Sequence, residues 1–249
     1  MYSWDPQVYA RNARYVADLA GEVVELLSAR SGQRVLDLGC GDGALTERLA
    51  AMGCDVTGVD SSPEMVAAPR ARGLDVRLAD GQRLAFFREF DAVFSNQALH
   101  WMPRADDVVA GVSRALVEGG RFVAECGGEG CIVTILAAIY EVLARRAIDG
   151  AQLNPWHFPA ADEYSHRLLA HGFRVDSIAL SPRTTFLPGG LRGWMETFAE
   201  SFTEALPADE RSRFLDEVED ALRPKLRAGD GSWSAYYVLL RFAATRQAS

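Results

Sequence analysis

Residues 35–46 read VLDLGCGDGALT, and this stretch decides the fold class. The apolar residues at its start are typical of a short buried strand, and three glycines follow at once, Gly39, Gly41 and Gly43. Glycine allows the chain to turn tightly and to approach a ligand closely, because it has no Cβ. The stretch therefore predicts a strand, a close turn and a helix over residues 45–52, with a ligand beside the turn.

Strand and helix patterns alternate on both sides of this turn. The predicted strands are residues 34–38, 55–60, 76–80, 90–95 and 121–125, and the predicted helices are residues 7–29, 45–52, 106–116 and a segment after 62. Ser62 suits the N-cap of that last helix and Pro63 its first turn, whereas Pro69 should shorten or kink it. Gly119 and Gly120 should stop the helix over 106–116. The alternation predicts a parallel sheet with helices on both faces.

The second half of the chain is richer in helix. Its predicted helices are residues 132–146, 161–171, 194–205 and 210–226, its predicted strands are residues 175–180 and 236–242, and PWHFP at 155–159 is a rigid loop. No flexible linker sets this half off, so we expect a single domain over residues 1–249. Within it we expect a ligand-binding core over residues 30–126. Residues 127–172 and 188–228 would be insertions that form a lid and face the substrate.

Acidic residues stand at the ends of three predicted strands. Asp37 comes just before the glycines, Asp60 ends the second strand, and Asp80 with Gly81 ends the third. In nucleoside-binding sheets of this kind, a carboxylate at the second strand end accepts hydrogen bonds from the ribose hydroxyls. Because parallel strands end at one edge of a sheet, the acids and the glycine turn together predict a nucleoside pocket.

The spacing of the glycines argues against a nicotinamide-dependent oxidoreductase. The dinucleotide fingerprint reads GxGxxG, whereas the third glycine here comes one residue early and gives GxGxG. An oxidoreductase is therefore the weaker interpretation of the turn.

Composition narrows the choice of partner and compartment. The chain has 26 basic and 34 acidic residues, a formal net charge of -8, so nucleic acid is not an expected partner. Its four cysteines form no CxxC pair and are expected to be buried thiols rather than a disulfide frame or a zinc site. No apolar run is long enough to cross a bilayer, and the N-terminus is unlike a signal peptide. We expect a cytoplasmic protein with no membrane partner.

Taken together, the motifs DLGCGDGALT, VTGVDSSPEM, LADGQ, FDAVFSNQALHW and LVEGGRFV resemble the class I S-adenosylmethionine-dependent methyltransferases. Within that family, the chain is most similar to the group that includes trans-aconitate methyltransferase and the carboxyl methyltransferase of biotin synthesis. The resemblance covers about residues 4–126 with specific motifs and the remainder more loosely. It implies a Rossmann-like α/β fold whose seven-stranded, mostly parallel sheet has a reversed last strand.

The resemblance also assigns S-adenosylmethionine as the cofactor and residues 30–126 as its binding core. By this resemblance, Asp37 would hold the turn and, through water, the methionine ammonium. Asp60 would accept hydrogen bonds from the ribose hydroxyls, and Asp80 would accept one from the adenine amino group. The other implied cofactor contacts are Gly39, Gly41 and Gly43 along the methionine and ribose, Gly81 and Gln82 beside the adenine, Ser61 and Met65 near the adenosine, Asn96 and Gln97 beside the methionine, and Tyr9 closing over the cofactor.

The stretch SNQALHW, residues 95–101, supplies the candidates for the substrate side of the site. His100 and Trp101 follow the fourth strand, where the transferred methyl would lie, and His100 is the first candidate for a general base. Trp101 is as well explained as a buried core aromatic. His157 in PWHFP is the second candidate base, although an aromatic plug explains that loop equally well. We expect no metal site.

These features predict a methyltransferase that acts on a small molecule, with O-methylation of a carboxylate or hydroxyl favoured. The alternative is an S-adenosylmethionine-binding protein of the same fold that has lost methyl transfer or catalyses a non-methylating reaction. Methylation of nucleic acid or protein is disfavoured by the charge and by SNQA, which stands where an NPPY-like motif would be. The chain is expected to be a monomer or a homodimer.

Overall fold

The structure of the chain is a computed structural model that describes residues 4–248. These residues form two compact units. The sheet unit comprises residues 15–129, 156–181 and 239–248, and the helical unit comprises residues 4–14, 130–155 and 182–238. None of the helices described over residues 4–248 is long and apolar enough to cross a membrane.

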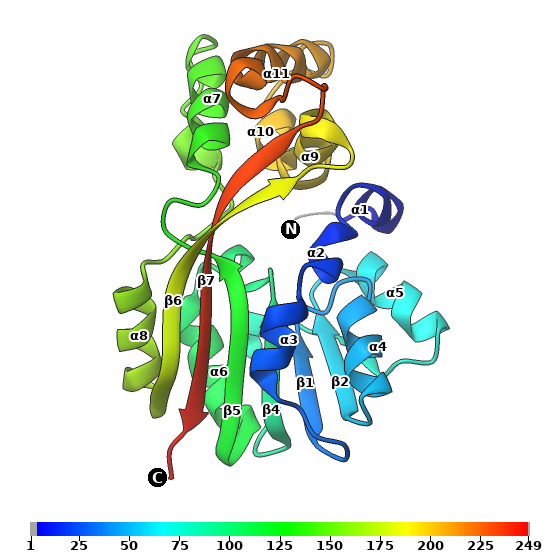
Figure 1. Ribbon diagram of the computed structural model, residues 1–249, viewed down its shortest axis with the longest axis vertical. Helices are drawn as coiled ribbons and strands as arrows, with labels where there is room; N and C mark the ends of the chain where they lie inside the picture. The colour runs from blue at the N-terminus through cyan, green and yellow to red at the C-terminus, as the bar shows by residue number, and fades with distance from the viewer. Residues whose placement is uncertain (1–3, 249) are drawn as a thin grey trace. The chain divides into compact units, whose positions relative to one another are not determined.

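A seven-stranded sheet with the strand order β3-β2-β1-β4-β5-β7-β6 forms the centre of the sheet unit (Figure 1). The strands are β1 Arg34–Leu38, β2 Asp55–Asp60, β3 Val76–Leu78, β4 Phe90–Asn96, β5 Leu116–Gly127, β6 Phe173–Phe186 and β7 Ser234–Arg246. The first five strands pair in parallel, and β7 runs antiparallel to β5. The predicted Rossmann-like α/β sheet with a reversed last strand is confirmed.

Helices cover both faces of this sheet. The helices of the sheet unit are α2 Tyr15–Asp18, α3 Gly21–Leu27, α4 Ala44–Ala51, α5 Pro63–Ala71, α6 Ala105–Ala115, α8 Ala161–Ala170, and the 3-10 turns η1 Gly81–Arg83 and η2 Leu99–Trp101. Alternate residues of the central strands pack against α6 and α8 on one face and against α3 and α4 on the other. Strands buried on both faces explain the nearly continuous apolar runs that the sequence shows.

The chain order reverses between β1 and β4, which are neighbours in the sheet although β2 and β3 separate them in sequence. Such a switch point leaves a crevice beyond the carboxyl ends of the two strands, because their connections leave toward opposite sides. The glycine turn follows β1, and SNQALHW spans the end of β4. The fold therefore brings the two most informative motifs to neighbouring strand ends.

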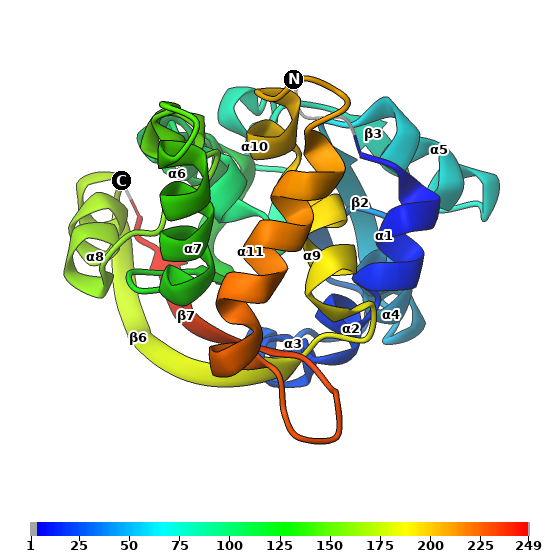
Figure 2. The same cartoon turned by 90° about the horizontal axis from the view of Figure 1, so that it is seen from above.

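The helical unit contains the ends of β6 and β7 and a group of helices. These helices are α1 Pro6–Asn12, α7 Val133–Ala144, η3 Gly150–Leu153, α9 Gly190–Phe198, α10 Glu200–Glu204 and α11 Arg211–Leu226. In Figure 2, α11 lies between α7 and α9 and packs on both. The Arg146 guanidinium, just after α7, pairs with Glu210 at 3.2 Å and with Glu217 on α11 at 2.9 Å.

Several predicted elements differ in length from those observed. The helix expected over residues 7–29 is three helices, α1, α2 and α3, and the helix expected over residues 194–205 is divided into α9 and α10 at Ala199. Asn12, the last residue of α1, donates a hydrogen bond to the Gly193 carbonyl of α9, and α3 begins at Gly21, a poor residue for a helix interior.

The pair Gly119–Gly120 does not stop α6, which already ends at Ala115. The pair lies inside β5, where Gly119 adopts a positive φ of 75°. As predicted, Ser62 caps α5 through a hydrogen bond to the Met65 N–H, and that helix is short, with Pro69 inside it.

The predicted insertion over residues 127–172 is divided between the two units. Residues 130–155 belong to the helical unit, whereas α8 belongs to the sheet unit. The reason is packing, because Tyr164 and Leu168 on α8 are buried in the main core of the sheet. The sequence showed the amphipathic helix but not the surface that it covers.

Candidate functional site

Two carboxylates, Asp37 and Asp60, lie at the ends of β1 and β2. The Asp37 carboxylate is buried and accepts a hydrogen bond of 2.7 Å from the Thr46 hydroxyl. Burial raises its pKa to about 7, with further contributions from Asp60 and Asp42, while the bond from Thr46 opposes the rise. Burial also raises the pKa of Asp60. The two strand ends therefore bring together two carboxyl groups that raise each other's cost of ionisation, and a cationic or donor-rich ligand would relieve this cost.

Backbone N–H groups hold the Asp60 carboxylate in place. Gly41 donates to one oxygen and Ser62 to the other, both at 2.9 Å, and these bonds lower the pKa against the effect of burial. Each carboxylate oxygen accepts more than one hydrogen bond, so Asp60 keeps acceptor capacity for a ligand. We call Asp37, Asp60 and Asp80 the acidic edge.

The three glycines of the turn have different surroundings. A Cβ on Gly39 would lie 2.2 Å from the Ala98 Cβ, and one on Gly43 would lie 2.6 Å from the Cβ of Pro69. A Cβ on Gly41 would have no neighbour within 4 Å. Of the three, Gly41 thus leaves open space beside Asp60, while Gly39 and Gly43 allow close packing inside the protein.

Asp80 follows β3 and is engaged by neighbouring side chains. It caps η1 by accepting from the Gln82 N–H at 2.9 Å, and the Gln82 amide donates to the same oxygen at 3.2 Å. The Arg104 guanidinium lies 3.6 Å from the other oxygen. Gly81 is packed against Met102, with 2.8 Å from its hypothetical Cβ to the sulfur. Asp80 is therefore a weaker candidate acceptor than Asp60.

The remaining predicted adenosine contacts follow β2. Met65 is buried on α5, and Ser61 is exposed in the turn before that helix. The backbone N–H of Ser61 contributes to holding Asp60. Both residues follow Asp60 in the chain, and their contact with the adenosine stays a prediction.

Asn96 and Gln97 end β4, at the neighbouring strand end. Asn96 is 9 % exposed, and its Oδ1 is buried without a hydrogen-bond partner among the described residues. Buried polar atoms are nearly always paired, so an orphan acceptor beside an open strand end indicates a place for a ligand donor. Gln97 has a positive φ of 54°, a conformation rare for residues other than glycine.

A buried ion pair that we did not predict supports Gln97. Glu125 on β5 is 1 % exposed and pairs with Arg241 at 2.6 Å. Its backbone carbonyl accepts a hydrogen bond from the Gln97 backbone N–H, and its carboxylate accepts one from the Gln97 side-chain amide. Arg241 also pairs with Glu22 at 2.6 Å. The signal was visible in RFVAE, because a charged residue that ends a buried strand needs a partner.

Aromatic side chains gather beyond β4. The Trp101 and Trp156 rings have centroids 5.4 Å apart, Trp156 stacks on Phe158 at 6.0 Å, and Phe158 lies 5.7 Å from the His100 ring. We call His100, Trp101, Trp156 and Phe158 the aromatic edge. The sequence indicated His100, Trp101 and an aromatic plug in the PWHFP loop, but not that Trp156 packs on Trp101 and Phe158 on His100.

The imidazole of His100 is fixed by the backbone. Its Nδ1 accepts a hydrogen bond of 3.1 Å from the Gly127 N–H. The backbone carbonyl of His100 accepts a further bond of 2.9 Å from the His157 N–H. The residue as a whole is partly exposed, but burial of the imidazole lowers its pKa to about 3. His100 is thus neutral at physiological pH.

The other two predicted side chains contact different elements. The His157 imidazole points to α8, with its Nε2 3.5 Å from the Glu163 carboxylate. Tyr9 belongs to the helical unit, where its ring contacts Trp4 at 5.7 Å and Phe198 at 6.3 Å. The roles expected for His157 and Tyr9 stay predictions.

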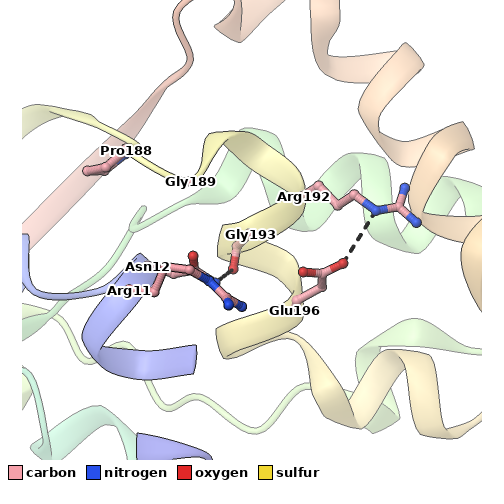
Figure 3. A pocket seen from close by; sticks show the side chains of 7 residues that line it. All are labelled: Arg11, Asn12, Pro188, Gly189, Arg192, Gly193 and Glu196. Carbon is pink, nitrogen blue, oxygen red and sulfur yellow. Dashed lines mark hydrogen bonds and ion pairs between the residues drawn. The ribbon is translucent and has the colours of Figure 1, made fainter. Parts of the chain in front are cut away.

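The helical unit has a pocket of its own, of about 420 Å³, between α1 and the start of α9 (Figure 3). It is lined by Arg11, Asn12, Pro188, Gly189, Arg192, Gly193 and Glu196. Its polar groups pair with one another, since Arg192 contacts Glu196 at 3.3 Å and Asn12 donates to the Gly193 carbonyl at 3.1 Å. None of the predicted site residues lines it, so we place the site at the sheet.

The four cysteines are buried free thiols, and burial raises the pKa of Cys40, which leaves it protonated. Over residues 4–248, no group of three or more His, Cys, Asp or Glu side chains is arranged to hold a metal ion.

Comparisons with known proteins identify the family of the chain. A family profile described as a methyltransferase domain matches residues 36–124, the segment from β1 to β5. A Schizosaccharomyces pombe protein named "Uncharacterized methyltransferase C70.08c" is 38% identical over 258 residues, which cover 98% of this chain and 98% of the relative.

Two further comparisons concern named enzymes. A trans-aconitate 2-methyltransferase of Mycobacterium tuberculosis is 36% identical over 181 residues, 72% of this chain and 63% of the relative. The solved geranyl diphosphate C-methyltransferase of Streptomyces coelicolor superposes with a TM-score of 0.55 at 18% identity and covers 96% of this chain and 82% of that one. At this low identity, the structural likeness concerns the fold alone.

Proposed function

The chain belongs to the class I S-adenosylmethionine-dependent methyltransferases, and on this premise we propose that it transfers a methyl group to an oxygen of a small molecule. The observation that carries the proposal is the acidic edge, with Asp60 held by Gly41 beside open backbone. Asn96, with its orphan acceptor at the next strand end, complements it.

The residues at these strand ends fit the cofactor of the family. S-adenosylmethionine carries an ammonium, two ribose hydroxyls and an adenine amino group, all of which donate hydrogen bonds. Asp60 would accept from the ribose, Asp80 from the adenine, and the Asn96 Oδ1 and Asp37 would serve the amino-acid end. The negative charge of Asp37 and Asp60 also favours a cofactor that is cationic at sulfur and nitrogen.

The cofactor supplies an activated methyl group. This chain therefore mainly has to bind the cofactor and the acceptor, orient them and exclude water. The Gly39–Gly43 turn and Asp60 would fix the nucleoside. The aromatic edge would shield the reacting centre, and the face of Trp101 would attract the cationic sulfonium.

A small acceptor with a carboxylate or hydroxyl oxygen is the class that we favour. The formal charge of -8 gives no broad basic surface for nucleic acid. The relatives from Mycobacterium carry trans-aconitate in their names, and this acid is therefore the first acceptor to try.

The experiment is an assay for adenosylhomocysteine release by the whole protein. It uses a panel of acceptors: trans-aconitate, other small carboxylic acids, and phenols. We expect turnover with at least one oxygen acceptor and its loss in Asp60→Ala. Ser31→Ala, in the turn before the amino end of β1, serves as a neutral control. Binding of adenosylmethionine without turnover on the whole panel would favour the alternative, a cofactor-binding protein without methyl transfer.

A further inference from the structure

The hydrogen bond to His100 Nδ1 fixes which ring nitrogen carries the proton. Its partner is the Gly127 backbone N–H at 3.1 Å, and a backbone N–H only donates. The Nδ1 atom must therefore be the unprotonated acceptor. A neutral imidazole has one proton, which is then on Nε2.

The Nε2–H group of His100 is available to a ligand. Among the described residues, no hydrogen bond reaches Nε2, and the atom is not one of the buried unpaired ones. His100 is partly exposed and lies in η2, shortly after Asn96 and Gln97 at the end of β4. A donor without a partner thus projects from the aromatic edge.

The surroundings of His100 oppose a second proton. Its described neighbours are the Trp101 and Phe158 rings and the backbone of Gly127 and His157, with no carboxylate among them to stabilise an imidazolium. Protonation of Nδ1 would also turn the bond from Gly127 into a clash of two donors. Burial is accordingly the cause of the lowered pKa.

A general base needs a vacant nitrogen facing the acceptor, and His100 does not have one. Resting on the proposed function, we propose that His100 serves methyl transfer as a fixed Nε2–H donor to the acceptor oxygen, held in this tautomer by Gly127, and not as the general base that the sequence suggested. Gly127 is then a positioning residue, acting through its backbone.

This role requires an acceptor oxygen that is already ionised. A carboxylate oxygen forms the bond to the methyl carbon, and the bond from that carbon to sulfur breaks with its electron pair left on sulfur. No proton is transferred in this step, so charge and atoms balance without a base. The donor orients the carboxylate and discriminates against an oxygen that still carries its proton.

The tautomer is tested first, on the whole protein without any acceptor. We would label the histidines with ¹⁵N, follow their ring nitrogen signals by NMR from pH 5 to pH 8, and assign His100 by its loss in His100→Gln. We expect the Nε2–H tautomer throughout, with no titration. An Nδ1–H tautomer, or titration near pH 6.5, would overturn the proposal.

Two matched variants then separate a donor from a base, with trans-aconitate and adenosylmethionine as probes. The amide nitrogen of His100→Gln replaces Nε2 as a donor but cannot act as a base, whereas His100→Ala removes both functions. We expect kcat/KM within about threefold of wild type for the glutamine variant and a loss of roughly 10- to 100-fold for alanine.

Equal losses in both variants, together with a wild-type rate that rises through pH 6 to 7, would contradict the donor role. If the wild type turned over neither a carboxylic acid nor a phenol, the proposed function would fail, while the nitrogen signals would still decide the tautomer. The two failures are therefore distinguishable.

Discussion

The acidic edge and the aromatic edge occupy neighbouring strand ends of one sheet, yet one offers hydrogen-bond acceptors and the other a donor. At each, a backbone N–H fixes a polar side chain, Gly41 on Asp60 and Gly127 on His100. The fixed carboxylate still accepts hydrogen bonds, whereas the fixed imidazole can only donate. The comparison indicates that the first edge is built for the donors of a cofactor and the second for the oxygen of an acceptor.

The largest expected effect is that of Asp60→Ala on cofactor binding. Loss of a charged acceptor for two ribose hydroxyls should weaken binding of adenosylhomocysteine by roughly 100-fold or more. Asp80→Ala is the matched control, because Asp80 already contacts Arg104, and about a 10-fold loss is expected. Calorimetric titration measures both, and equal effects would show that the acidic edge does not centre on Asp60.

The glycine turn should separate packing from binding. Gly39→Ala would place a Cβ 2.2 Å from that of Ala98 at a φ of +76°, so we expect a loss of about 3 kcal/mol in the free energy of unfolding. Gly41→Ala meets no atom within 4 Å and should cost only about 1 kcal/mol for its positive φ.

Urea denaturation of the two variants provides the measurement. The cofactor affinity of the folded Gly41→Ala variant should fall, because Gly41 borders the open space. Equal stability losses in both variants would contradict the different surroundings assigned to these glycines.

Asp37→Asn should change how stability depends on pH. The pKa of Asp37 is raised to about 7 in the folded protein, so its ionisation weakens folding as the pH rises from about 4 to about 7. Asparagine still accepts the bond from Thr46 but does not ionise. The variant should therefore gain stability relative to wild type over that interval. Thermal unfolding of both proteins at several pH values is the measurement, and a difference in unfolding temperature that does not change with pH would contradict this prediction.

The smallest expected effect belongs to His157. Its exposed contact with Glu163, at 3.5 Å, should contribute no more than about 0.5 kcal/mol, and the backbone bond to His100 persists in His157→Ala. Turnover by this variant should stay within about threefold of wild type. A loss as large as that of His100→Ala would place His157 in the site together with the aromatic edge.

The strand ends that carry Asp37 and Asp60 could be predicted from the sequence because their signals are local. Glycine spacing and an acid at a strand tip are properties of a few neighbouring residues, and the alternation of elements gave β1 and β2 with the bounds that the structure has. The orphan Oδ1 of Asn96 could not be predicted, because it depends on which buried atoms find partners.

The aromatic edge was predicted only in outline because its geometry is not local. His100 is bonded by Gly127 from β5 and packed by Phe158 from a loop almost 60 residues away in sequence. Proximity to a strand end suggested a base, whereas the tautomer depends on a backbone group that no motif reveals. The division of the insertion at α8 has the same origin, since Tyr164 is buried by residues distant in sequence.

A crystal structure of the protein with adenosylhomocysteine tests the central claim most directly. The account predicts the ribose hydroxyls within hydrogen-bond distance of the Asp60 carboxylate and the amino-acid end of the ligand beside the Asn96 Oδ1. A ligand bound away from the Gly39–Gly43 turn, or a turn left empty at saturating ligand, would contradict it.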